Sequence, residues 1–410
     1  MASNEREIIY ESLIEIVENG SFSHVVEKNV LDKYDYLEGV EKAFIKRVIE
    51  GTIENQLIID DVINDYSKVK CNKLKPAIRT ILRMSIYQIL FMDKVPDSAA
   101  CNEAVKIATR HGFKSLSGFV NGVLRNVARN KTSIKIDTNN AFPEWIVEHF
   151  ESNYGKDISE KILKSMQEES LVTIRVRDEL SDYGGLLKVK DFDDAYYVSK
   201  GKSIYDIDGY ESGKFIVQDL SAQRVMKFSG IKENDMVLDL CASPGGKAIH
   251  AADLGGIVRA RDLTDDKILR IDENIERCNM SSRKVDITTE AFDAAVFDES
   301  SVGRYDVVIA DLPCSGLGVM GRKADIRFKT KKEDLNALVS IQRDILTNAW
   351  QYLKQGGKLI YSTCTINKDE NENQVKWMIE KFPLELISEK QYFPGIDEGD
   401  GFYIAQLIRK

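Results

Sequence analysis

Apolar positions in the first third of the chain recur at helical spacing. In EREIIYESLIEIVENG the apolar residues from Ile8 to Val17 return every three or four positions, and the pattern stops at Gly20. VEKAFIKRVIEGTIENQ, LKPAIRTILRMSIYQILFM and SLSGFVNGVLRNVARN have the same period, and Pro76 is placed to begin the helix in the second of them. We therefore predict an all-helical domain over residues 1–138.

The pattern changes after residue 138. Helical spacing continues over roughly 143–169, and short runs rich in β-branched and aromatic residues follow, separated by polar turns. The runs LVTIRVRDEL, GLLKVKDF, AYYVSK and SIYDI predict short strands. Residues 139–225 are therefore expected to form a small α+β subdomain that connects the helical domain to the rest of the chain.

Strands and helices alternate over residues 226–410. The predicted strands are MVLDLC, GIVRARDL, RKVDITTEAFD, YDVVIADLP and KLIYSTC, and the clearest helices are EDLNALVSIQRDILTNAWQYL and NENQVKWMIEKF. Alternation of this kind predicts a doubly wound α/β domain, in which helices cover both faces of a parallel sheet. The last run, GFYIAQLIRK, has strand character and is expected to add an antiparallel edge strand.

Composition indicates a globular protein in a reducing compartment. The chain has 410 residues, enough for two or three domains, and is 43% hydrophobic. No stretch approaches 18 uninterrupted apolar residues, and the start MASNEREIIY lacks a basic region followed by an apolar core, so neither a membrane span nor a secretory signal is expected. Six cysteines without a Cys-x-x-Cys pair argue against a disulfide framework or a zinc cluster. We expect a cytoplasmic monomer that binds no metal.

The distribution of charge qualifies the net charge of −9, which alone argues weakly against a nucleic-acid partner. Residues 61–135 carry 14 Lys and Arg against 5 Asp and Glu. A basic segment on an acidic protein is the footprint expected of a phosphate-binding face, although a solvated helix surface has the same appearance.

Polar side chains follow the predicted strands of the α/β domain, where open parallel sheets bind their ligands. The first strand runs into DLCASPGGKA, in which Asp239 precedes the pair Gly245 and Gly246, and paired glycines let the backbone approach a ligand. The spacing is neither G-x-G-x-x-G nor that of a Walker loop, so a pyrophosphate is not expected. Asp262 ends the second strand and suits a ribose, while Asp293 ends the third and could accept from an exocyclic amine. An adenosine without a diphosphate fits this set, which makes S-adenosylmethionine the obvious cofactor.

Two cysteines stand at the ends of the fourth and fifth predicted strands. Cys314 lies in ADLPCSGLG and Cys364 lies in YSTCT. Cysteine is most often a small buried hydrophobe, and three others are expected to be so: Cys71, Cys101 and Cys278. Neighbouring parallel strands would instead bring Cys314 and Cys364 together at the edge of the cofactor, whereas Cys241 lies within the cofactor loop.

A methyl donor beside a thiol suggests methylation of C5 of a cytosine. That carbon is a poor nucleophile until a thiolate adds to C6 and makes C5 an enamine carbon, which can attack a methyl sulfonium. Lys247 is a candidate for the positive charge that favours the thiolate. The C5 proton and the thiol must leave afterwards, a step in which Cys314 could take part, and Asp311 could hold the base at N3 or its exocyclic amine.

Several of these segments together resemble a known family. DLCASPGGK, VIADLPCSGLGV, GGKLIYSTCT and GDGFYIAQL closely resemble the RNA cytosine-C5 methyltransferases, and FIVQDLSAQRVM matches the same group. The helical part, with FVNGVLRN, resembles the NusB-like RNA-binding domain of the RsmB (Sun/Fmu) type, which acts on 16S rRNA in bacteria. The resemblance implies an α/β class I (Rossmann-like) methyltransferase domain over 226–410, an all-α NusB-like domain over 1–138 and an RRM-like subdomain over 139–225.

The resemblance also implies roles for individual residues. Cys364 corresponds to the nucleophile that bonds to C6, Cys314 to the cysteine that helps release the methylated base, and Asp311 lies between cofactor and base. Asp262 is implied at the ribose and Asp293 at the adenine. The S-adenosylmethionine loop is implied at Cys241, Ala242, Ser243, Pro244, Gly245, Gly246 and Lys247.

Some features depart from the family pattern, and some alternatives stay open. Ser243 and Ala248 stand where the family usually has Ala and Thr, and Gly321 and Ala324 stand where Arg and Pro are common. Asp286 is an alternative to Asp293 at the adenine. A transfer RNA substrate and a non-catalytic RNA-binding assembly factor are the alternative functions, and a nucleotide-dependent oxidoreductase is disfavoured by the missing G-x-G-x-x-G.

Overall fold

The computed structural model describes residues 5–136 and 138–410, and these residues fall into two compact units. One unit comprises the chain up to His149 together with residues 322–330, and the other comprises residues 150–321 and 331–410. Within the described residues, no helix is both long and apolar enough to cross a membrane.

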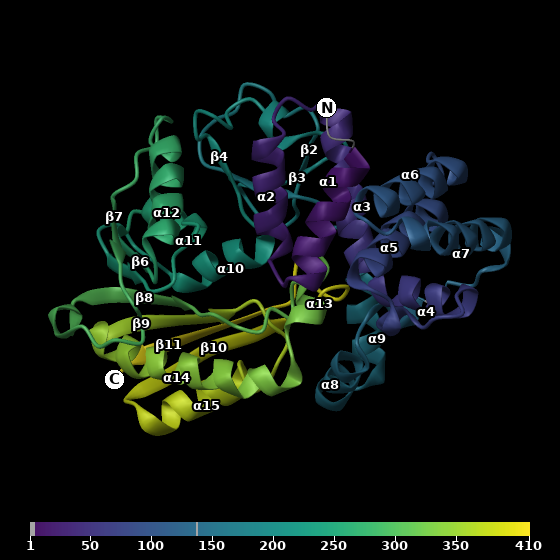
Figure 1. Cartoon of the computed structure of the whole chain (residues 1–410). Coiled ribbons are helices and arrows are strands. Elements are labelled where there is room, and N and C mark those ends of the chain that lie inside the picture. Colours follow the sequence, from purple (N-terminus) through teal and green to yellow (C-terminus); the bar gives the residue numbers. More distant parts are fainter. Residues whose placement is uncertain (1–4, 137) are drawn as a thin grey trace. The chain divides into compact units, whose positions relative to one another are not determined.

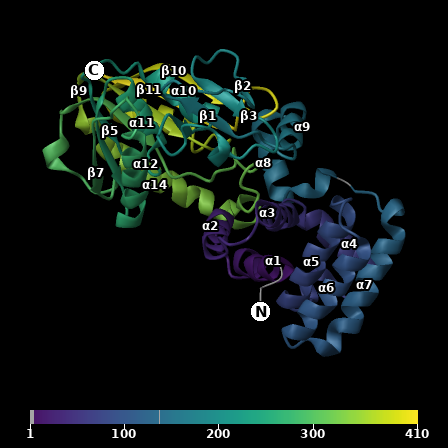
Figure 2. The ribbon, with the colours of Figure 1, turned by 90° about the horizontal axis from the view of Figure 1, so that it is seen from above.

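The first unit is helical, as the spacing of its apolar residues predicts. A π-helical turn over Ile14–Glu18 extends the first helix. The main helices are α1 (Glu5–Leu13), α2 (Ser23–Lys33), α3 (Gly39–Glu54), α4 (Gln56–Tyr66), α5 (Pro76–Phe91), α6 (Asp97–Arg110) and α7 (Ser117–Asn130). Figure 2 shows α4 to α7 packed alongside one another. Pro76 begins α5, and this helix is buried on nearly all sides, including its polar residues Thr80, Arg83, Ser85 and Gln88.

A segment distant in sequence completes this helical unit. The short helix α13 (Ile326–Lys329) carries Arg327, whose buried guanidinium donates to the backbone carbonyls of Glu54 (3.1 Å) and Ala141 (3.4 Å). The carboxylate of Asp325 accepts from the backbone N–H of Ser23 at 2.9 Å. Residues 322–330 are therefore held in the first unit by polar contacts.

The second unit begins with helices and a small antiparallel sheet. Helix α8 (Glu144–Tyr154) crosses the division between the units, and α9 (Lys156–Ser165) follows it. The sheet has the order β2-β3-β1-β4, with β1 (Thr173–Val176), β2 (Leu186–Lys188), β3 (Ala195–Val198) and β4 (Phe215–Val217). The expected strand at SIYDI is wrong. Ile204–Asp206 is a 3₁₀ turn, because the Ser203 side chain accepts from the N–H of Tyr205 and caps it.

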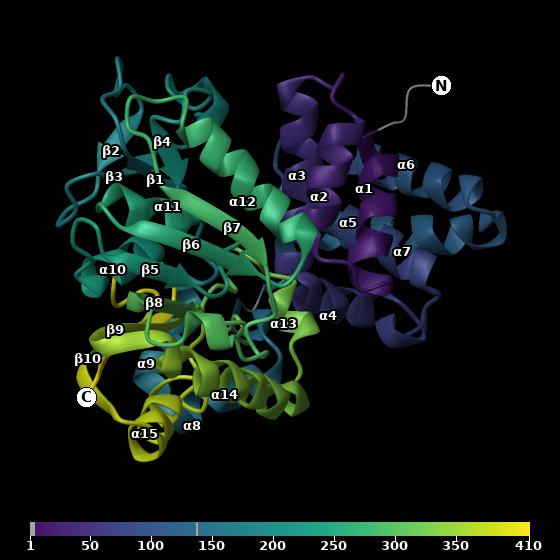
Figure 3. The same ribbon diagram turned by 90° about the vertical axis from the view of Figure 1, so that its left-hand side faces the viewer.

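The large sheet contains all the parallel strands that the alternating pattern predicts. Its order is β10-β11-β9-β8-β5-β6-β7. The parallel strands are β5 (Met236–Asp239), β6 (Ile257–Asp262), β7 (Ile287–Ala291), β8 (Tyr305–Asp311) and β9 (Leu353–Thr363). Figure 3 shows how they succeed one another across the sheet.

The prediction that GFYIAQLIRK forms the edge strand is wrong. It forms β11 (Phe402–Arg409), which is antiparallel to β9 but lies inside the sheet, and β10 (Leu384–Tyr392) is the edge. Most side chains of β11 are buried, as expected of an internal strand, whereas β10 is buried mainly at its two ends. The polar sequence of β10 therefore gives little strand signal.

Helices cover both faces of the large sheet, as Figure 1 shows. Val308 and Ala310 of β8 pack in one apolar cluster with α14 (Leu335–Tyr352) and α15 (Glu372–Lys381). Val307 and Ile309 point to the opposite face, where α10 (Leu220–Ser229), α11 (Gly246–Asp253) and α12 (Asp265–Cys278) pack. The alternation along a single strand thus explains both layers.

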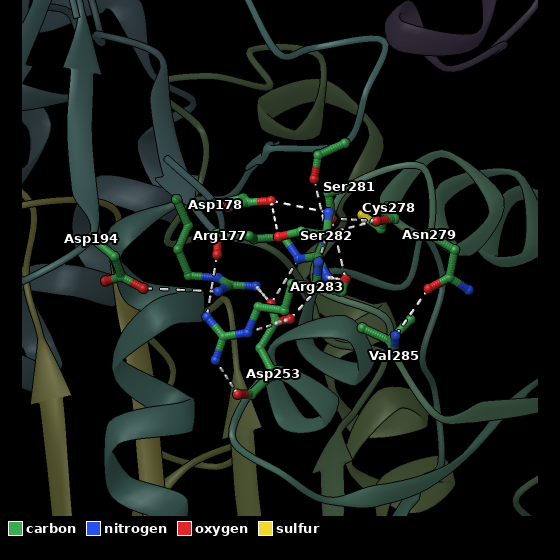
Figure 4. A network of polar contacts seen from close by, with 12 residues as sticks. Arg177, Asp178, Asp194, Asp253, Cys278, Asn279, Ser281, Ser282, Arg283 and Val285 are labelled. Atoms are coloured by element: carbon green, nitrogen blue, oxygen red, sulfur yellow. Dashed lines mark hydrogen bonds and ion pairs between the residues drawn. The ribbon is translucent and has the colours of Figure 1, made fainter. Parts of the chain in front are cut away.

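A buried ionic network joins the small sheet to helix α11 within the second unit (Figure 4). The carboxylate of Asp253, at the end of α11, accepts from Arg175 at 2.6 Å and from Arg177 at 2.8 and 2.9 Å. Arg283 lies within 3.5 Å of the same carboxylate, and Asp194 lies 3.8 Å from Arg175. Arg175 of β1 and Arg177, which follows this strand, are almost completely buried, so Asp253 is the shared counter-ion of two cations that have little access to water.

We expect Asp253→Asn to lower the free energy of unfolding by about 3–5 kcal/mol, because it leaves buried guanidinium groups without their counter-ion. Urea unfolding of the full chain measures this change. Asp178→Asn is the matched control, since the hydrogen bonds of Asp178 to Ser282 lie at the surface and should contribute less than about 1 kcal/mol. Equal effects of the two substitutions would contradict this interpretation.

Candidate active site at the carboxyl edge of the large sheet

The loop after β5 places a buried carboxylate beside a glycine turn. Asp239 is 1% exposed, and within the described residues neither of its carboxylate oxygens has a hydrogen-bond partner. Burial raises the pKa of Asp239 to about 7, although Lys247 opposes the increase. Gly245 has a φ of +101° and precedes the first residue of α11, so the turn requires a residue without a side chain.

The polar residues after β6 and β7 lie where the sequence predicts. Asp262 is 4% exposed, and its carboxylate accepts from the backbone N–H of Ser243 at 2.9 Å and from Lys267 at 2.8 Å. Asp293 follows the carboxyl end of β7 and is exposed. Asp286 precedes β7, and its carbonyl accepts from Val258 at the beginning of β6. Asp286 therefore lies at the opposite edge of the sheet, which favours Asp293 as the residue near a ligand.

The two strand-end thiols are in contact. Asp311 of β8 is in register with Ser362 of β9, and the chain beyond these residues brings the Sγ atoms of Cys314 and Cys364 to 3.3 Å from each other. Both cysteines are half-buried. The pairing of neighbouring parallel strands thus produces the juxtaposition that the sequence suggests.

Asp311 is held between helix α11 and β9. One carboxylate oxygen accepts from Lys247 Nζ at 2.5 Å, and the other accepts from Ser362 Oγ at 2.8 Å. Burial opposes the charged form of Lys247, but the charge of Asp311 and its hydrogen bond outweigh burial and raise the pKa of the lysine. The charge of Cys364 contributes to that increase after those of Asp311 and Asp239.

The remaining cysteines do not share this environment. The hydrogen bond to Cys364, followed by burial, raises the pKa of Cys314 well above its ordinary value. Burial, with the charges of Asp262 and Asp239, also raises the pKa of Cys241, so that its sulfur is not activated. The other three are buried in the cores, as predicted: Cys71, Cys101 and Cys278.

The sequence does not predict that polar residues close to the two cysteine loops are buried. Glu370 is fully buried and accepts from Ser315, Gln342 and Asn367. The run NKDENENQ reads as an exposed loop and helix start, and no hydrophobic period marks its buried positions. Its place directly after the strand-end STCT was the available signal. Within the described residues no group of three or more His, Cys, Asp or Glu could hold a metal ion.

Comparison with known families and proteins gives matches over both units. Residues 228–408 match the family model described as 16S rRNA methyltransferase RsmB/F, and residues 3–129 match the NusB family. The chain is 31% identical to the probable ribosomal RNA small subunit methyltransferase B of Bacillus subtilis (strain 168), over 99% of this chain and 98% of that protein. It is 28% identical to ribosomal RNA small subunit methyltransferase B of Salmonella arizonae, over 100% and 99% of the two chains.

Solved structures show the same fold at lower identity. The crystal structure of PH0851 aligns over 100% of both chains with a TM-score of 0.81 and 21% identity. The structure of NSun6 from Pyrococcus horikoshii aligns over 65% of this chain and 98% of its own, with a TM-score of 0.58 and 20% identity.

Proposed function

Because this chain belongs to the family of the ribosomal RNA small subunit methyltransferases B, we propose that it methylates C5 of a cytosine in 16S rRNA through a bond between Cys364 and C6. S-adenosylmethionine is the methyl donor of this RNA methyltransferase. The observation that carries the proposal is the contact between the strand-end sulfurs, with Lys247 and Asp311 beside them.

The chain's own residues account for each requirement of this reaction. Lys247, kept cationic by Asp311, favours the thiolate of Cys364, which adds to C6 of the cytosine and places an electron pair at C5. Asp311 holds the base through its exocyclic amine, or through N3 once the ring is protonated there. S-adenosylmethionine supplies an electrophilic methyl group when bound. Water then takes the C5 proton, the electron pair of that C–H bond re-forms the C5–C6 double bond, and Cys364 leaves C6 as a thiolate that is in hydrogen-bond contact with the Cys314 thiol.

Residues at the carboxyl edge of the sheet fit this cofactor. The buried carboxylate of Asp239 has no side-chain hydrogen-bond partner within the described residues, and so it suits the cationic amino group of the cofactor's methionine part. Asp262 would hold the ribose and Asp293 the adenine. The loop from Cys241 to Lys247 would lie along the cofactor, because its glycines allow close approach of the backbone.

The identity of the methylated base tests the proposed function. Small-subunit rRNA and S-adenosylmethionine with a labelled methyl group are incubated with the protein, and the nucleosides are separated by mass spectrometry. We expect labelled 5-methylcytidine. Methylation of another base or position would overturn the proposal, and labelling of transfer RNA in preference to rRNA would overturn its substrate.

The buried carboxylate of Asp239 should make protein stability depend on pH. Its pKa is about 7 in the folded protein, against an ordinary value of 3.8, so its protonated form is favoured by folding. The stabilisation is present below pH 4 and is lost as pH rises toward 7. Compared with Asp239→Asn, the wild-type protein should therefore lose stability between about pH 4 and 7, with a constant difference above pH 7. Urea unfolding at several pH values measures this difference.

The same residue should make cofactor binding depend on pH with the opposite sign. A bound cation favours the ionised carboxylate, so the affinity for S-adenosylhomocysteine should rise by up to about tenfold per pH unit until pH 7 and then level off. Isothermal titration should show this slope in wild type and in Glu233→Gln, an exposed control. Its persistence in Asp239→Asn would contradict the assignment.

The basic segment over 61–135 is the proposed contact with RNA phosphates. Three of its arginines already form ion pairs with carboxylates of the helical unit. The pairs are Arg79–Glu18, Arg83–Asp60 and Arg110–Glu7. Arg125 and Arg129 are exposed on α7. Arg125 and Arg129 are therefore better candidates for contact with RNA phosphates than the three paired arginines.

We expect the double substitution Arg125→Ala and Arg129→Ala to weaken RNA binding and to reduce its dependence on salt. Loss of two phosphate contacts should lower the slope of log affinity against log salt by roughly 1.4–1.8. Filter binding between 50 and 200 mM KCl measures both effects. The control replaces two exposed lysines of α15, Lys376 and Lys381, by Ala. An equal loss in the control would contradict a specific role for α7.

A further inference from the structure

The carboxylate of Glu370 joins the two loops that carry the active-site thiols. This side chain is fully buried between β9 and α15. One oxygen accepts from the backbone N–H of Ser315 at 2.9 Å and from the amide of Gln342 at 3.0 Å. The other accepts from the hydroxyl of Ser315 at 2.5 Å and from the amide of Asn367 at 2.9 Å. A single carboxylate therefore connects the loop after β8, the loop after β9 and helix α14.

These contacts are next to both sulfurs in the sequence. Ser315 follows Cys314, and Thr365 follows Cys364. The hydroxyl groups of Ser315 and Thr365 are 2.7 Å from each other, so the Glu370 contacts continue directly into the second loop. A connected, buried set of hydrogen bonds thus links the residues that follow the two cysteines and fixes the sulfurs 3.3 Å from each other.

The groups that contact the Glu370 carboxylate are donors. Backbone N–H and amide groups of Ser315, Gln342 and Asn367 only donate, and both carboxylate oxygens accept from them. The negative charge of Glu370 contributes to the raised pKa of Cys314, after the hydrogen bond to Cys364 and burial. On the other side of the site, the Lys247 ammonium is paired with Asp311 at 2.5 Å, and the charge of Cys364 contributes to the raised pKa of this lysine.

We propose that Glu370 is a positioning residue that fixes the loops of Cys314 and Cys364 against each other and keeps Cys314 a thiol while Cys364 serves as nucleophile. The division of labour between the sulfurs rests on the proposed function, but the positioning and the charge do not. In this arrangement two chemically identical side chains lie 3.3 Å apart, and the Glu370 carboxylate is hydrogen-bonded to Ser315, the residue directly after Cys314.

Alkylation of Cys314 tests the charge without RNA or cofactor. In a Cys364→Ser background, the rate of reaction of Cys314 with iodoacetamide is followed from pH 7.5 to 10 by mass spectrometry of the peptide that contains it. Glu370→Gln should react about tenfold faster at pH 9, because loss of the negative charge lowers the pKa of the thiol by about one unit. Glu380→Gln, the same substitution at an exposed position of α15, should have no effect.

Two further variants separate charge from loosening of the loop. Ser315→Ala removes a hydroxyl contact but keeps the carboxylate, and Glu370→Asp keeps the charge but shortens its reach. Both should leave the alkylation rate within twofold of the background. If Ser315→Ala accelerates alkylation as much as Glu370→Gln, the faster reaction comes from easier access of iodoacetamide to Cys314. That result would overturn the role of the Glu370 charge.

Turnover tests the positioning. With Cys364 present, Glu370→Gln and Ser315→Ala should each lower kcat about tenfold or more, with the KM for S-adenosylmethionine within twofold of wild type. A fully active Ser315→Ala together with a Glu370→Gln that does not fold would overturn the proposal, because the network would then serve stability alone. If the wild-type protein made no 5-methylcytidine, the proposed function would fail while the alkylation result would still decide the charge role.

Discussion

A Cys364→Ala variant is expected to lose formation of 5-methylcytidine by on the order of 10⁴-fold or more, the loss typical of removing an essential nucleophile. Without a sulfur at C6, the cytosine ring has no electron pair to direct from C5 to a methyl sulfonium. The contact of Cys364 with Cys314 and the neighbouring Lys247 ammonium favour this sulfur over the other thiols. Transfer of labelled methyl groups to RNA measures the loss.

The substitution should leave the fold and the cofactor site intact. S-adenosylhomocysteine should bind Cys364→Ala as it binds wild type in isothermal titration, which separates loss of chemistry from loss of structure. Cys101→Ala, which removes a buried thiol of the helical unit, is the matched control and should retain activity. A Cys364→Ala variant that still forms 5-methylcytidine would overturn the assignment of the nucleophile.

The site could be predicted from the sequence where it depends on strand ends. Parallel strands bring their carboxyl ends to one edge, so apolar runs followed by DLCASPGGK, ADLPC and YSTCT were enough to place the glycine turn after β5 and both thiols at that edge. The same rule distinguishes Asp293 from Asp286, but only after the limits of β7 are known. A shift of a few residues in a predicted strand would have reversed that choice.

Other parts of the molecule could not be predicted because their polar residues are buried. The edge strand β10 is largely polar, so its sequence gives little strand signal. GFYIAQL therefore has the pattern of a last, edge strand, although β10 lies beyond it in the sheet. Residues 322–330 are held in the helical unit by Asp325 and Arg327, which a hydrophobic pattern treats as exposed. Glu370 and Gln342 are hidden for the same reason. Hydrogen bonds between residues distant in sequence decide these positions, and a period of apolar residues does not record them.

A Cys314→Ala variant is expected to accumulate RNA bound covalently to the protein while its turnover falls by about 10²–10⁴-fold, the range for loss of a group that assists proton transfer. Cys364 can still add to C6 in this variant, but the thiol in contact with it is missing when the bond must break. Denaturing gels should show a slower protein band that ribonuclease removes.

If the two thiols have different roles, the covalent RNA adduct of Cys314→Ala must depend on the sulfur of Cys364. The band should be absent in Cys364→Ala and in the variant that lacks both cysteines, since alanine at position 364 cannot bond to the base. The raised pKa of Cys314 agrees with this order, because a thiol that stays protonated does not compete with Cys364 for C6. Normal turnover without an adduct in Cys314→Ala would contradict the release role. An adduct that persists in Cys364→Ala but disappears in Cys314→Ala would show that the roles are exchanged.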